Sequence, residues 1–230
     1  MFTLEAFAVA FAGFEVAWLL GIPLWHTRLP GGRWLAGAGV LWIGGIAFAA
    51  RWGLFRDAYG SVPPVDGVVG LSGLLLAFVF VVTTLVAPVA TASRAVSTRS
   101  LVAVHVFRAI VGASFLSLAS KASLGPTLGY WGGGAEVAAG LLALALVAAM
   151  PRLDADRRRR WVLAWSAVSF GTLIVTIAAW FLSMPSSWQR FGESALTAKI
   201  TDFPYAVLPT FLWPACLLDL AGVVFRDNRL

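Results

Sequence analysis

Seven long apolar stretches dominate the chain, each close to the length at which a helix crosses a lipid bilayer. Such a helix needs about 20 mostly apolar residues. The stretches leave no room for a soluble domain within the 230 residues. The sequence therefore predicts an all-α, polytopic transmembrane helix bundle that forms a single domain, residues 1–230. The predicted spans are residues 4–25, 34–50, 67–91, 101–120, 133–150, 161–183 and 203–225.

Composition excludes the other broad classes of protein. Hydrophobic residues make up 60% of the chain and charged residues 12%, about half the charged share of a soluble domain. Disorder needs the opposite balance, and a disulfide scaffold needs more than one cysteine, whereas Cys216 has no partner within the chain. The chain start has no basic region and carries Glu5, so we expect the first span to be retained rather than cleaved. The second span is the shortest, which keeps open a six-span arrangement with a re-entrant segment.

Basic residues are unequally shared between the two sides of the predicted bundle. Eleven lie on one side and five on the other, with Arg108 inside a span. Short loops rich in Lys and Arg stay in the cytoplasm, so we expect the N-terminus outside and the C-terminus in the cytoplasm. The run 157–160 is the strongest topological anchor, and binding of anionic lipid headgroups is the alternative interpretation. We attribute the net charge of +6 to membrane orientation and expect no nucleic-acid partner.

Ionisable residues inside the predicted spans are the first candidates for a functional site. A charge at the centre of a membrane helix costs at least ~2.5–3.5 kcal/mol on insertion scales, so these residues are rare and are usually paired. We predict that Arg108 pairs with Asp219, with Glu15 within reach. Near the outer boundary we predict a second pair, Lys121 with Glu136. Each pair either holds helices in register or forms a ligand-binding site or charge relay.

The seventh span carries three prolines at five-residue intervals: Pro204, Pro209 and Pro214. A proline inside a helix removes a backbone donor and tends to kink the helix, and broken membrane helices can line a binding site. We therefore regard these prolines as candidate helix breaks, although Pro204 could simply open the helix.

Cofactor and catalytic motifs are missing from the sequence. The seventh span has no lysine for a retinal Schiff base, and there is no metal cluster, CxxC pair or phosphate loop. His26 and His105 could ligate one haem between two helices, but boundary histidines with ordinary hydrogen bonds are the preferred interpretation. We expect no cofactor, no metal and no catalytic residue, and favour a protein that is not an enzyme.

Two segments resemble a family of uncharacterised bacterial seven-helix integral membrane proteins. They are HVFRAIVGASFLSLASKASLGPTLGYWGGGAEV, residues 105–137, and TDFPYAVLPTFLWPACLL, residues 201–218. Arg108 and the three prolines match positions of that family's pattern. Glu136 stands where the family usually has aspartate, and Gly125-Pro126 replaces a Leu-Pro. The resemblance implies a multi-pass protein of the bacterial cytoplasmic membrane and supplies no activity.

Three functions are compatible with these features. The favoured one is handling of a small molecule or ion, as in a transporter or receptor, through a polar site inside the membrane. An accessory subunit of a larger membrane complex is the second. An enzyme acting on a lipid or isoprenoid substrate, with Glu136 or Asp219 as the acid, is the third. The expected partners are membrane lipids, together with other membrane proteins or further copies of the chain.

Overall fold

The computed structural model describes residues 30–52, 98–184, 188–192 and 213–227, with isolated positions between 73 and 97 and at 208. The described elements are all helices, with no strand among them, which confirms the predicted all-α class. Spans 4–25 and most of 67–91 lie outside the described residues. So do four candidate residues of the site: Glu15, His26, Pro204 and Pro209.

The chain divides into two compact units. One unit comprises residues 1–97 and 200–214, and the other comprises residues 98–199 and 215–230. In the first unit, helix α2 runs over Pro30–Arg51 and covers the predicted second span. At 22 residues, α2 extends about 33 Å.

The second unit contains three helices that are long and apolar enough to cross a membrane, as judged within the described part of the chain. They are Thr98–Ser120, Thr127–Arg152 and Ala155–Ser183. They match the predicted fourth, fifth and sixth spans, but two of them begin about six residues earlier than predicted. These three helices support the prediction of a helical membrane protein.

Two of these spans change geometry along their length. The first comprises α6, Thr98–Val104, and α7, Phe107–Ser120. The second opens as a π-helix η1, Thr127–Gly132, continues as α8, Gly133–Ala149, and ends in a 3₁₀ turn η2, Met150–Arg152. The third is the unbroken helix α9, Ala155–Ser183. The last described helix is α11, Trp213–Asp227.

A left-handed residue closes α7. Ala122 has a φ of 51°. Its amide donates to the Ala119 carbonyl at 2.9 Å, and the Ser123 amide donates to the Leu118 carbonyl at 2.8 Å. This pair of bonds is a Schellman motif, which satisfies carbonyls that the helix end leaves free. The chain then turns and re-enters the membrane at Pro126, the N-cap of η1.

A tight turn at Pro151 connects α8 to α9. Asp154 is the N-cap of α9, and its carboxylate accepts from the Arg157 amide at 2.8 Å. Acidic caps stabilise a helix start because they satisfy a free N–H group and face the positive end of the helix dipole. Both connections between the three spans are therefore set by local chain chemistry.

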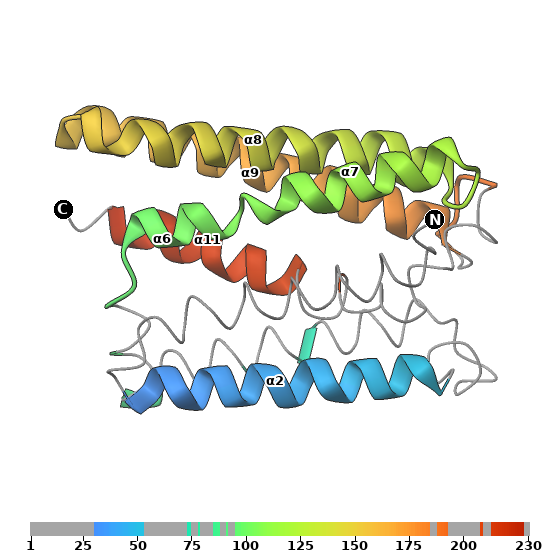
Figure 1. Ribbon diagram of the computed structural model, residues 1–230, viewed down its shortest axis with the longest axis horizontal. Coiled ribbons are helices and arrows are strands. Elements are labelled where there is room, and N and C mark those ends of the chain that lie inside the picture. Colours follow the sequence, from blue (N-terminus) through green and yellow to red (C-terminus); the bar gives the residue numbers. More distant parts are fainter. Residues whose placement is uncertain are drawn as a thin grey trace, which may run out of the picture. The chain divides into compact units, whose positions relative to one another are not determined.

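The three spans run side by side, with α8 in contact with both α7 and α9 (Figure 1). Large apolar side chains cover their outer surfaces, while several polar side chains are buried between them. This distribution is the reverse of that in a soluble bundle, and it suits helices surrounded by lipid. Exposed examples are Ile110, Leu141, Leu142, Leu144, Val168, Phe170, Ile174 and Val175.

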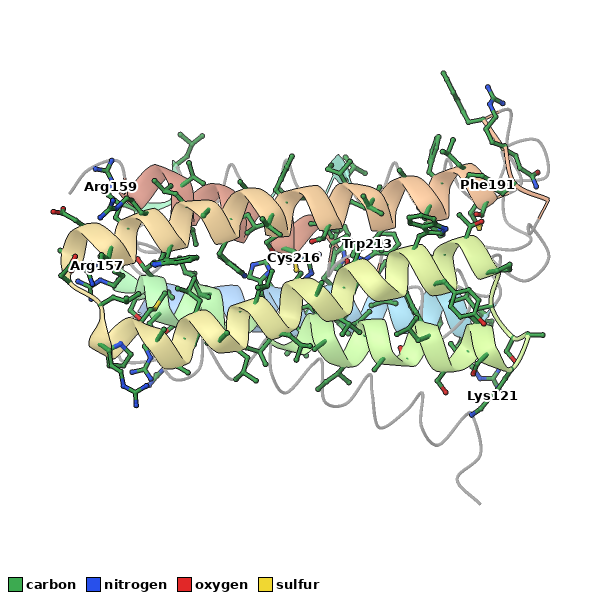
Figure 2. All side chains as sticks on the ribbon, turned by 90° about the horizontal axis from the view of Figure 1, so that it is seen from above. Lys121, Arg157, Arg159, Phe191, Trp213 and Cys216 are labelled. Atoms are coloured by element: carbon green, nitrogen blue, oxygen red, sulfur yellow. The ribbon has the colours of Figure 1, made fainter. Side chains whose placement is uncertain are left out.

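The basic run and Lys121 lie at opposite ends of this three-helix unit. Figure 2 shows Arg157 and Arg159 at one end and Lys121 with Phe191 at the other. This arrangement agrees with the prediction that the segment of residues 157–160 and Lys121 lie on opposite sides of a membrane. The helix rotation that decides which polar residues meet is set by the packing inside the unit.

Candidate functional site

The central feature of the three-helix unit is a buried ion pair between Arg108 and Glu136. Arg108 lies in the first turn of α7, and Glu136 lies in the first turn of α8. Arg108 Nε donates to Glu136 Oε2 at 2.6 Å, and Nη2 donates to Oε1 at 3.0 Å. The side chains are only 1% and 2% exposed. This is the two-pronged geometry in which an arginine binds a carboxylate most strongly.

Helix α9 holds the opposite edge of the same guanidinium. Nη1 donates to the Ser169 hydroxyl at 2.6 Å and to the Ser169 carbonyl at 3.1 Å. Nη2 also donates to the Thr172 hydroxyl at 3.1 Å. An arginine has five N–H donors, and these contacts with those to Glu136 use all five. Arg108 therefore joins three helices through one fully bonded group.

The ion pair lies deep in all three spans. At 1.5 Å per residue, Arg108 is about 18 Å from Ser120, and Ser169 is about 21 Å from either end of α9. Glu136 is about 13 Å from the start of its span at Thr127. A bare charge at such depth would be expensive, so mutual pairing and the hydroxyl contacts are what allow it.

Glycines bring α7 and α8 close enough for this contact. A Cβ atom added at Gly140 would fall 2.8 Å from the Cα of Ala109, and one added at Gly133 would fall 3.0 Å from the Gly112 carbonyl oxygen. One added at Gly112 would meet the Gly133 carbonyl and the Val137 amide. Small residues of this kind let membrane helices approach closely. The close approach places Glu136 directly opposite Arg108.

One face of α9 carries a row of polar side chains that the sequence analysis did not identify. Their spacing of three, three, four and seven residues follows the helical period, and this periodicity in the sixth span was the available signal. Thr172 donates to the Ser169 carbonyl at 2.8 Å, and Thr176 donates to the Thr172 carbonyl at 3.1 Å. The row consists of Ser166, Ser169, Thr172, Thr176 and Ser183.

The span that carries Arg108 is interrupted just before it. The amides of His105, Val106, Arg108 and Ala109 each donate to the carbonyl three residues earlier, at 3.1–3.2 Å. The resulting break separates α6 from α7 at His105 and Val106. Tight turns inside a helix often mark functional hinges. This break lies inside the span, directly before Arg108 of the ion pair.

His105 lies at this break and is completely buried. Its ring meets Trp165 of α9 edge-on, with a centroid separation of 5.0 Å. The span begins at Thr98, so His105 lies seven residues inside it rather than the four that follow from the predicted start at residue 101. Within the described residues there is no group of three His, Cys, Asp or Glu side chains able to hold a metal ion.

Of the two ion pairs predicted from the sequence, the pair of Lys121 with Glu136 is wrong. Glu136 bonds Arg108 rather than Lys121, and Lys121 is exposed at the end of α7 (Figure 2). The described partners of Arg108 all belong to α8 and α9, and its predicted pairing with Asp219 stays a prediction. Asp219 belongs to α11, as does Pro214, its second described residue. The side chain of Asp219 and the residues just before α11 are outside the described part.

Most of this chain matches the model of one protein family. A model described as a domain of unknown function, DUF8737, matches residues 67–226, about 70% of the chain. The chain belongs to the DUF8737 family. The DUF8737 region contains Arg108, Glu136 and the polar face of α9. No curated protein and no solved structure matches the chain.

Proposed function

We propose that this DUF8737 protein handles a small molecule or ion through the polar site around Arg108 and Glu136. The observation that supports the proposal is the position of a buried arginine–carboxylate pair, with two hydroxyl partners, deep inside three packed spans. Ionisable groups at that depth commonly serve transport, relay or ligand recognition. We further propose a multi-pass protein of the bacterial cytoplasmic membrane, with about seven spans and a cytoplasmic C-terminus.

The two edges of the guanidinium suggest how such a site would work. Ser169 and Thr172 hold Arg108 from α9 independently of Glu136. The edge facing Glu136 presents two parallel N–H groups, which suit any carboxylate or phosphate. An anionic ligand that replaced Glu136 on this edge would find the arginine already in place. An anion is therefore the ligand class that the geometry favours.

A structural role in a larger complex is the second candidate. The observation favouring it is that every Arg108 donor is already bonded, as expected of a network that only fixes helix register. The third candidate, acid catalysis by Glu136, has less support. Both carboxylate oxygens accept from Arg108, so in this arrangement neither oxygen is open to a substrate.

The first experiment is native mass spectrometry of the gently extracted full-length protein, with identification of what is released. A bound small molecule would support the proposed function. Stoichiometric partner chains without a ligand would favour the subunit candidate.

Binding is then tested by thermal unfolding against a panel of small anions and cations. A ligand at a hundredfold excess over its Kd stabilises a protein by about 2.7 kcal/mol. We expect such stabilisation in the wild type and in Lys121→Gln, which changes a cation at an exposed position. The double variant Arg108→Met/Glu136→Leu should fold and lose the ligand-dependent shift. An unchanged shift in the double variant would reject this site as the place of binding.

A further inference from the structure

Two buried polar atoms on α9 stand out because they have no hydrogen-bond partner among the described residues. They are the indole Nε1 of Trp165 and the hydroxyl Oγ of Ser166. The two side chains are 5% and 2% exposed. A buried donor or hydroxyl without a partner costs about 1–3 kcal/mol, and native proteins leave very few such groups. Trp165 and Ser166 are neighbours in the sequence, and each therefore needs a partner that the described residues do not supply.

The surroundings of these atoms are polar and irregular. Trp165 contacts the ring of His105, and His105 marks the break between α6 and α7. Ser166 lies one turn before Ser169, which bonds Arg108. Irregular backbone at membrane depth occurs where it is buried in protein or lines a water-filled cavity. Two independent observations, the helix break and the partnerless atoms, thus lie in the same region.

We infer that ordered water binds between the α6–α7 break and α9, where it bonds Trp165 Nε1 and Ser166 Oγ. A buried water typically makes about three hydrogen bonds to groups that the protein leaves unsatisfied. Water suits both atoms, because its oxygen accepts from the indole N–H and it can either accept from or donate to the serine hydroxyl. The site is separate from the fully bonded ion pair and does not depend on the proposed function.

Water-edited solid-state NMR on the full chain in lipid bilayers tests this directly. The protein is labelled with ¹⁵N at the tryptophan indoles and backbone amides, and magnetisation is transferred from water. The Trp165 indole is assigned by its loss in Trp165→Phe, or through its own backbone resonances, which needs no variant. We expect its signal to build up much faster than those of the buried amides of Leu173 and Ala139. A build-up as slow as theirs overturns the inference.

Thermal unfolding of Ser166→Ala provides a second readout. If water bonds this hydroxyl, removal of the hydroxyl leaves the water with one hydrogen-bond partner fewer. We therefore expect Tm to fall by about 2–4 °C, which corresponds to about 1 kcal/mol for a chain of this size. The control is Ser114→Ala, which removes a buried hydroxyl bonded only within its own helix, to the Val111 carbonyl at 2.7 Å. We expect a smaller shift there. A rise in Tm for Ser166→Ala would mean that the hydroxyl has no partner, and would overturn the inference.

Discussion

Arg108 and Glu136 are 28 positions apart in the sequence, yet their side chains form two parallel hydrogen bonds of 2.6 and 3.0 Å. The bonds join α7 to α8 deep inside the spans. Since Ser169 and Thr172 bond the other edge of the arginine, one side chain connects three helices.

Arg108→Met and Glu136→Leu should each destabilise the protein by about 3–5 kcal/mol, because each leaves one buried charge without its partner. The double variant should lie close to the wild type, since replacing a whole buried pair with apolar residues is often neutral or stabilising. Thermal or denaturant unfolding in detergent measures all three. Additive losses in the double variant would contradict this account.

Gly140→Ala should destabilise the contact between α7 and α8. Its new Cβ would meet the backbone and side chain of Ala109, and overpacking of this kind typically costs about 1–3 kcal/mol. The matched control is Gly134→Ala in the same helix, where nothing lies within 4 Å of the added Cβ. We expect the control to be neutral or to gain up to about 1 kcal/mol from helix propensity. Unfolding midpoints of the two variants give the comparison, and equal effects would argue against close packing.

Ala122→Gly should stabilise the turn after α7. Ala122 has a positive φ of 51°, a conformation that costs a non-glycine residue roughly 1–2 kcal/mol. Glycine removes this cost but loses more backbone entropy on folding, so a net gain of about 0.5–1 kcal/mol is expected. The unfolding midpoint measures it. A loss of stability would show that Ala122 does not adopt the left-handed conformation.

Asp154→Ala should weaken the start of α9 by about 1 kcal/mol, because the Arg157 amide loses its capping acceptor. The ion pair between the two side chains adds little, since both are well exposed. Asp156→Ala is the control, because it removes a nearby acidic residue that is not the cap. Hydrogen exchange of the amides in the first turn of α9 should rise in Asp154→Ala only. Similar exchange in the two variants would contradict the capping role.

The mispairing of Glu136 has a specific origin. The predicted fifth span starts at residue 133, which places Glu136 near the outer boundary beside Lys121. In the structure this span begins at Thr127 with a π-helical turn, so Glu136 lies about 9 Å deeper at 1.5 Å per residue. The change in depth brings Glu136 to the level of Arg108 and leaves Lys121 at the end of its helix.

Apolar run lengths and a low charge content were enough to predict a helical membrane protein, because the bilayer imposes its thickness on any helix that crosses it. The cost of a charge in lipid was enough to single out Arg108 and Glu136 as residues that need partners. Only the tertiary structure decided that they are each other's partners and that Ser169 and Thr172 complete the site. That choice depends on helix rotation and on the close approach at Gly112, Gly133 and Gly140. Both are determined by packing between segments distant in sequence, which no local pattern specifies.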